Sequence, residues 1–233
     1  MRKHPINKSD ENLGWRWEMV TDIDEWKIPD VQVMKLAFIL GKKQKKKILD
    51  LGCGIGRHII YFAREGFQVY GCDISEQAIN FTNKWLKEEK LEAEVQKGIF
   101  TSINYPDNTF DLVIAINVIY HGFKKDIIKG FSEVLRILKP GGIFYGTLKT
   151  KNKDEPFDDK SITLIDNQTI ILNEGIEANI PHFFSYKEDL IEFFREYEIV
   201  QITYCEYFNT PQLLKSFIDK TGSSYFHFLL KKH

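Results

Sequence analysis

Three glycines at alternate positions, Gly52, Gly54 and Gly56, follow a short apolar run that contains Asp50. A glycine-rich turn between a strand and a helix lets backbone amides approach a ligand where any side chain would collide with it. Asp73 lies about twenty residues further on, at the end of the next apolar run, where a carboxylate can accept hydrogen bonds from both hydroxyls of a ribose. We therefore expect the glycines and Asp73 to lie at neighbouring strand ends and to bind a nucleoside.

The residues around the glycines distinguish two kinds of nucleoside ligand. A dinucleotide-binding turn needs glycine at its first, third and sixth positions, and the sixth position counted from Gly52 is Arg57. Asp50 would also repel a pyrophosphate. An adenosyl sulfonium carries no phosphate, and the ammonium group of its amino-acid end needs an acceptor such as Asp50. The pattern therefore favours an adenosyl sulfonium over a nicotinamide dinucleotide.

Strand-like and helix-like segments alternate through the first two-thirds of the chain. Strands separated by helices predict right-handed crossovers and a parallel, doubly wound α/β sheet of the Rossmann-like type. The last two strands are joined with less helix than the earlier ones, which predicts an antiparallel strand at the C-terminal edge. The expected strands are residues 46–52, 68–75, 93–98, 110–119, 143–149, 198–208 and 224–232, and the expected helices are residues 56–66, 76–90, 125–138, 186–197 and 210–219.

The alternation fails after Thr150, and this divides the chain into three expected parts. Residues 151–184 contain a polar, turn-rich stretch and a hairpin pattern around Asp166 and Asn167, so we expect a small cap inserted over the site. Residues 1–45 are expected to form a helical arm or lid. Residues 46–150 and 185–233 are expected to form the cofactor-binding domain.

Four successive motifs point to a known family. They read LDLGCGIGRH, VYGCDIS, PDNTFDLVIAINVIYH and LKPGGIFYGT, and they lie within residues 45–150. In this order they resemble the motifs of class I S-adenosylmethionine-dependent methyltransferases, which implies S-adenosylmethionine as the cofactor. Relatives often carry an acid where Ile99 stands. The implied cofactor contacts are Asp50, Gly52, Cys53, Gly54 and Gly56 at the methionine end, Asp73 at the ribose, Ile74, Ile99 and Phe100 around the adenine, and Asn117 facing the cofactor.

Two histidines are the candidates for catalysis. Methyl transfer from a sulfonium is an in-line displacement, so the enzyme mainly holds the nucleophile in line with the methyl group in a dry pocket. An acceptor that begins protonated would still benefit from a base. His121 follows the strand that carries Asn117, and His182 lies in the expected cap, although His121 could instead cap or pack the next helix. No CxxC pair occurs in the sequence, and we expect no metal site.

The expected function is a methyltransferase that acts on a small-molecule acceptor, similar to compact bacterial metabolite and tellurite-resistance-like enzymes. An RNA or other nucleic-acid methyltransferase and a non-catalytic S-adenosylmethionine-binding regulatory module stay open as alternatives, and a dehydrogenase is disfavoured by Arg57 and Asp50. The stretch NVIY after the fourth strand lacks the prolines typical of enzymes that grip a flipped base. The net charge of −1 gives no general attraction to duplex DNA.

Length, cysteine count and the distribution of apolar residues indicate the cellular compartment. The chain has 233 residues, enough for one large domain, and its three cysteines are an odd number, which argues against a disulfide framework. No signal-peptide-like stretch and no run of eighteen apolar residues occurs. We therefore expect a cytoplasmic protein with no membrane partner, and the sequence leaves its oligomeric state open.

Overall fold

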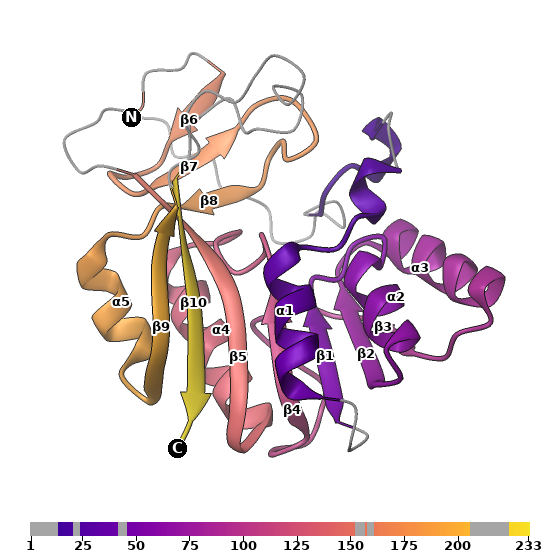
Figure 1. Ribbon diagram of the computed structural model, residues 1–233. Helices are drawn as coiled ribbons and strands as arrows, with labels where there is room; N and C mark the ends of the chain where they lie inside the picture. The colour runs from indigo at the N-terminus through magenta and orange to yellow at the C-terminus, as the bar shows by residue number, and fades with distance from the viewer. Residues whose placement is uncertain (1–13, 21–23, 42–45, 152–156, 158–160, 206–223) are drawn as a thin grey trace.

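The computed structural model describes residues 14–20, 24–41, 46–151, 157, 161–205 and 224–233. A seven-stranded sheet forms its centre, with the strand order β3-β2-β1-β4-β5-β10-β9 (Figure 1). All strands except β10 run in the same direction, because β10 pairs antiparallel with both β5 and β9. The strands are β1 (Lys47–Leu51), β2 (Gln68–Asp73), β3 (Glu94–Lys97), β4 (Phe110–Ala115), β5 (Leu138–Thr150), β9 (Tyr197–Cys205) and β10 (Ser224–Lys232).

This architecture confirms the expected Rossmann-like sheet, mostly parallel with an antiparallel strand near its C-terminal edge. The strand order reverses between β1 and β4, which both lie in the middle of the sheet. At such a reversal the connections leave in opposite directions and open a crevice at the carboxyl ends of the strands. The fold therefore places the expected ligand site at the end of β1.

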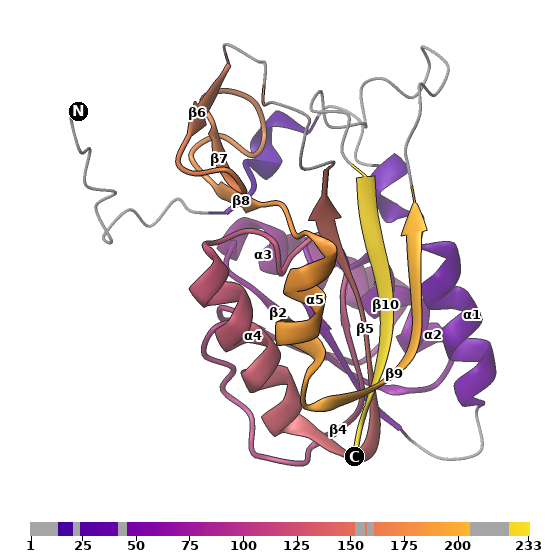
Figure 2. The same ribbon diagram turned by 90° about the vertical axis from the view of Figure 1, so that its left-hand side faces the viewer.

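Helices cover both faces of the sheet. One apolar layer joins α1, α2 and α3 to side chains such as Ile48 and Leu112, and the other joins α4 and α5 to side chains such as Leu49 and Val113. Successive residues of a strand point to opposite faces, so adjacent residues of β1 serve both layers. Figure 2 shows α4 and α5 on the opposite side of the sheet from α1 and α2. The helices are α1 (Val31–Leu40), α2 (Arg57–Arg64), α3 (Glu76–Glu89), α4 (Lys124–Ile137) and α5 (Lys187–Phe194).

Side-chain caps fix where two of these helices begin. Asp30 accepts hydrogen bonds from the backbone N–H groups of Gln32 and Val33 at the start of α1, at 2.8 and 3.3 Å. Ser75 accepts one from Ala78 at the start of α3, at 3.3 Å. Such caps satisfy N–H groups that have no partner within the helix. Two short 3₁₀ helices, Trp17–Met19 and Glu25–Lys27, precede α1.

A second, three-stranded antiparallel sheet lies over the carboxyl ends of the central strands (Figure 1). It consists of β6 (Ile162–Leu164), β7 (Thr169–Leu172) and β8 (Pro181–Phe183), and the expected hairpin around Asp166 joins β6 to β7. The backbone N–H of Phe183 donates to the carbonyl of Tyr120 at 2.8 Å, which fastens β8 to the segment after β4.

Some expected boundaries differ from the structure. The expected strand 143–149 begins earlier, at Leu138, and runs through Pro140, with Gly141 at a φ of +75°. The expected strand 110–119 ends at Ala115, because Asn117 turns the chain with a φ of +59°. The expected helix 210–219 lies outside the described residues. No helix in the described part of the chain is long and apolar enough to span a bilayer.

Candidate functional site

A cavity of about 580 Å³ opens at the carboxyl ends of β1, β2 and β4, where the strand order reverses. Its volume falls within the usual range for small-molecule sites, roughly 300–1,000 Å³. The glycine turn, Asp73 and the segment from Ile116 to Val118 form its floor, and residues of the arm and of the second sheet form its upper wall. The cavity therefore gathers residues that lie far apart in the sequence.

The glycine turn holds three left-handed backbone conformations, with φ of +70°, +54° and +89° at Gly52, Gly54 and Gly56. A Cβ at Gly52 would lie 2.3 Å from a methyl carbon of Val118, and one at Gly56 would lie 2.5 Å from a methyl carbon of Thr82. Real Cβ contacts are much longer, so two of the glycines are required by the protein's own packing. Gly54, the middle glycine, faces the cavity and the arm.

Asp73 connects the glycine turn to the start of α3. Its two carboxylate oxygens accept hydrogen bonds from the backbone N–H groups of Gly54 and Ser75, each at 2.8 Å. Burial raises the pKa of Asp73 above its ordinary value, and these backbone hydrogen bonds oppose that shift. A carboxylate has about four acceptor positions, so both oxygens can each accept one further hydrogen bond. Asp73 lines the cavity and is placed to accept from a ligand's hydroxyl groups.

Asp50 lies beneath the glycine turn rather than in the cavity wall. Its side chain is 2% exposed, and its Oδ2 has no hydrogen-bond partner among the described residues. The Nδ1 of His58 lies 3.5 Å from that oxygen. The Nε2 of His58 accepts from the backbone N–H of Asp30 at 3.2 Å, so in the neutral imidazole the proton is on Nδ1 and points toward Asp50.

His58 is therefore a site residue that the sequence analysis missed. It lines the cavity, stands between that space and Asp50, and ties the start of α1 to the glycine turn. The alternation of side chains along β1 is the sequence signal that could have identified His58. Asp50 shares the face of β1 that packs on α2, and His58 is the second residue of α2.

The other predicted cofactor contacts also line the cavity, but they differ in exposure. Ile99 is 44% exposed at its edge, whereas Phe100 is 8% exposed and packs against Gly130. Asn117 receives a hydrogen bond from the Thr147 hydroxyl, at 3.2 Å, on its side-chain oxygen. Ile74 and Cys53 complete this set. Burial raises the pKa of the Cys53 thiol well above its ordinary value, which keeps it protonated and unreactive.

A tryptophan cluster forms part of the upper wall. Trp15, Trp17 and Trp26 line the cavity with ring centroids 4.9 to 6.0 Å apart. A Cβ on Gly54 would lie 2.8 Å from the Trp17 ring, so this ring covers the middle of the glycine turn. The backbone N–H of Arg16 donates to the carbonyl of Ile176 at 3.0 Å, which joins the arm to the loop before β8.

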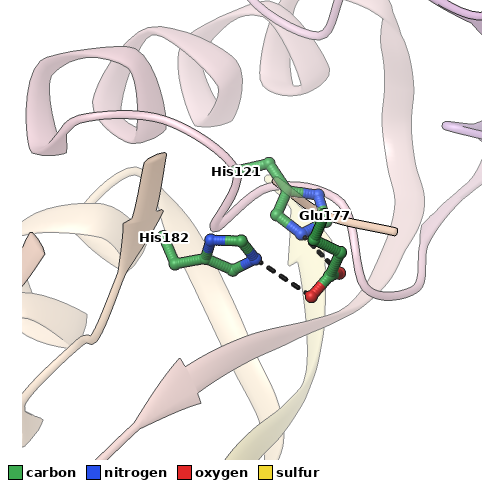
Figure 3. Close-up of side chains that lie close together, drawn as sticks. All are labelled: His121, Glu177 and His182. Carbon is green, nitrogen blue, oxygen red and sulfur yellow. Dashed lines mark hydrogen bonds and ion pairs between the residues drawn. The ribbon is translucent and has the colours of Figure 1, made fainter. Parts of the chain in front are cut away.

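The two predicted catalytic histidines lie side by side, with Glu177 between them (Figure 3). The Nε2 of His121 is 3.2 Å from one Glu177 oxygen, and the Nε2 of His182 is 3.2 Å from the other. His121 lines the cavity, whereas His182 is fully buried behind it. Glu177 was not predicted, since it is 56 residues from His121 in an irregular loop.

Burial and charge set the protonation states of this cluster. Burial lowers the pKa of His121 to about 4, although its contact with Glu177 works in the opposite direction. Burial would raise the pKa of Glu177, but its close contacts with both histidines hold it well below its ordinary value. At neutral pH the cluster therefore presents an ionised carboxylate and a neutral His121.

Comparisons with known proteins agree with this geometry. Residues 48–142 match the family described as "Methyltransferase domain". The sterol 24-C-methyltransferase ERG6B of Gibberella zeae is 37% identical over 114 residues, which are 47% of this chain and 29% of that protein. The sterol 24-C-methyltransferase erg-4 of Neurospora crassa is 32% identical over 174 residues, which are 67% of this chain and 45% of that protein. These alignments thus span less than half of either relative.

The crystal structure of the PH0226 protein from Pyrococcus horikoshii OT3 has a similar fold. It aligns with a TM-score of 0.64 and 20% identity, covering 87% of this chain and 89% of that one. That identity supports the fold alone. The family match goes further and places residues 48–142 in a methyltransferase domain family, and the curated relatives that align with this part of the chain are sterol methyltransferases.

Proposed function

We propose that this protein transfers the methyl group of S-adenosylmethionine to a small-molecule acceptor. The observation that carries the proposal is the cavity at the strand-order reversal, where Asp73 and the glycine turn meet. Both oxygens of Asp73 keep an acceptor position for ribose hydroxyls. Asp50 supplies a buried negative charge behind the glycine turn, which attracts an ammonium group at the methionine end of the cavity.

S-adenosylmethionine supplies the activated methyl group, so the protein's task is to bind, orient and exclude water. Asp73 and the glycine turn orient the nucleoside, with Ile74 and Ile99 beside the adenine. His58 lines the cavity in front of Asp50 and holds that carboxylate in place near the methionine end. The tryptophan cluster covers the glycine turn and keeps the methionine end dry. Alignment of acceptor and methyl group in such an enclosed site supplies most of the rate enhancement.

The acceptor is proposed to enter between the tryptophan cluster and the second sheet, with residues 151–184 as a cap over it. His121 faces this side of the cavity and is neutral at neutral pH. The surrounding aromatic and aliphatic side chains favour an acceptor with an apolar portion. Sterol methylation is named for the curated relatives, so sterol-like compounds belong in the first set of acceptors tested.

A cytoplasmic location is part of the proposal. It is supported by the three cysteines, all of which are free thiols in the structure, two of them buried. Free thiols persist in a reducing compartment.

The test begins with calorimetric titration of the protein with S-adenosylmethionine, S-adenosylhomocysteine and NADH in parallel. We expect the first two to bind and NADH not to bind. Methyl-labelled cofactor is then incubated with a small-molecule extract, with sterols, and with total RNA. Label in a small molecule supports the proposal, and label in RNA favours the nucleic-acid alternative.

Two further outcomes would contradict the proposal. Cofactor binding without S-adenosylhomocysteine formation from any pool would favour the non-catalytic binding module. Binding of NADH alone would overturn the interpretation of the glycine turn.

A further inference from the structure

We propose that His121, Glu177 and His182 form a binding site for one divalent transition-metal ion such as Zn²⁺. Their candidate ligand atoms, two imidazole nitrogens and a carboxylate oxygen, all lie within 4.8 Å of one another. Two histidines and one carboxylate are a ligand set that Zn²⁺ and similar ions use when coordination positions stay open for other ligands. The proposal replaces the expectation that the chain has no metal site.

The spacing of the ligand atoms suits a single ion. Each histidine Nε2 lies 3.2 Å from an oxygen of Glu177. Ligands bound to one tetrahedral ion at about 2.1 Å are roughly 3.4 Å apart. Each histidine nitrogen is therefore already near the separation from the carboxylate that one ion requires, and the whole set must draw in from a spread of up to 4.8 Å to hold the ion. Figure 3 shows both Nε2 atoms directed at the carboxylate.

The hydrogen bonding of His182 supplies an independent argument. Its Nδ1 lies 2.9 Å from the carbonyl oxygen of Ile180, which can only accept, so Nδ1 carries a proton. In the neutral imidazole, Nε2 is then an acceptor, and it faces an oxygen of Glu177 that is also an acceptor. Two acceptors at this distance repel each other unless a cation or a proton lies between them. A backbone carbonyl that orients the outer nitrogen is also the usual support of a metal-bound histidine.

The backbone already holds the ligands in place. His121 and His182 form an isolated β-bridge between the segment after β4 and β8. The adjacent hydrogen bond from Phe183 to Tyr120 fastens the same two segments. His182 is fully buried, so its side chain is already held in place and loses little conformational freedom when it binds an ion. The metal would join the second sheet to the methyltransferase domain.

One neighbouring charge opposes the ion. Lys149 is 1% exposed, and its positive charge acts on both His121 and Glu177. A second cation near an ammonium group is less stable than it would be alone. We therefore expect a site of lower affinity than a structural zinc site with four protein ligands.

The position of the ion suggests its use. His121 lines the cavity, so open coordination positions would face the side where an acceptor enters. A divalent ion binds oxygen, nitrogen or sulfur atoms and lowers the pKa of a bound hydroxyl or thiol. Binding of the acceptor by the ion rests on the proposed function, whereas binding of the ion to the protein does not.

The experiment measures metal and cofactor separately on the same full-length protein. Protein stripped with a chelator is titrated with Zn²⁺ in a calorimeter and with Co²⁺ by visible absorption, and metal content is measured after gel filtration. Glu177→Gln and His182→Gln remove one ligand each. Glu174→Gln, an exposed acid three residues before Glu177, is the matched control. Circular dichroism and S-adenosylhomocysteine binding report whether each variant folds.

We expect one ion per chain in the wild-type protein and in Glu174→Gln, and binding weakened by at least about tenfold in the two ligand variants. Failure of folded wild-type protein to take up Zn²⁺, Co²⁺, Mn²⁺ or Fe²⁺ would overturn the proposal and leave a proton-sharing His–Glu–His network. Equal uptake by folded ligand variants would also overturn it. Metal uptake without S-adenosylhomocysteine binding would contradict the proposed function and leave the metal site standing.

Discussion

Replacement of Asp73 by asparagine tests the proposed ribose contact most directly. The carboxylate accepts from the backbone N–H groups of Gly54 and Ser75, at 2.8 Å each, and keeps acceptor positions for two ribose hydroxyls. An asparagine side chain has the same shape but only one oxygen. Its NH₂ group would face one of the two backbone N–H groups, and its remaining oxygen would be a weaker acceptor.

The magnitude follows from the bonds that are lost. A hydrogen bond to a charged group contributes about 1.5–3 kcal/mol, and a buried N–H group left without a partner costs about 1–3 kcal/mol. We therefore expect Asp73→Asn to lower the free energy of unfolding of the unliganded protein by about 1–3 kcal/mol. The dissociation constant of S-adenosylhomocysteine should rise by about 5- to 150-fold, which corresponds to about 1–3 kcal/mol.

A matched control separates the two effects. Asp111 also accepts from a backbone N–H, that of Lys47 at 2.8 Å, and from the Lys139 ammonium at 2.7 Å. It lies at the start of β4, at the opposite end of the sheet from the cavity. Asp111→Asn should therefore lower the unfolding free energy without changing S-adenosylhomocysteine affinity.

Urea unfolding of both variants measures the loss of stability, and calorimetric titration measures the loss of S-adenosylhomocysteine affinity. Unchanged affinity in folded Asp73→Asn protein would refute the ribose contact. Equal loss of affinity in both variants would show that the effect is global rather than local to the site.

The sequence predicts the parallel part of the fold well, because it depends on local patterns. The strands β1 and β4 are short apolar runs, and a helical pattern follows each of β1, β2 and β4. The position of β10 between β5 and β9 has no such signal. It depends on the pairing of β10 with two other strands over long sequence separations, for example Ser224 with Thr150. A local pattern predicts that a strand exists but not which strands it joins.

The candidate site also contains residues that local spacing predicts and residues that only tertiary packing brings together. Asp73 and the glycines were predicted because their spacing is set by one strand–helix–strand unit. Asp50 was predicted at the methionine end, acting directly or through water, and its burial behind His58 depends on the side of β1 that α2 covers. Glu177 could not be predicted, because an irregular loop brings it between His121 and His182.

Four further predictions test the cavity, the packing and the electrostatics of the protein. S-adenosylhomocysteine should change the fluorescence of the tryptophan cluster, and an unchanged spectrum at saturation would contradict its contact with the cavity. Gly56→Ala combines a φ of +89° with a clash on Thr82 and should lower the unfolding free energy by about 2–4 kcal/mol. Gly141→Ala, at a φ of +75° with nothing within 4 Å, should lose only about 1–2 kcal/mol in the same urea titration. The hydrogen bond from Arg136 lowers the pKa of Glu133 to about 2 from an ordinary value of 4.5. Because the folded-state pKa is the lower one, this stabilisation is full above pH 4.5 and is lost as the pH falls toward 2. With allowance for solvent screening, Glu133→Gln should lower the unfolding free energy by about 1–2 kcal/mol at neutral pH. That difference from the wild-type protein should shrink as unfolding is measured at lower pH, and a constant difference would show that the charge of Glu133 is not its cause.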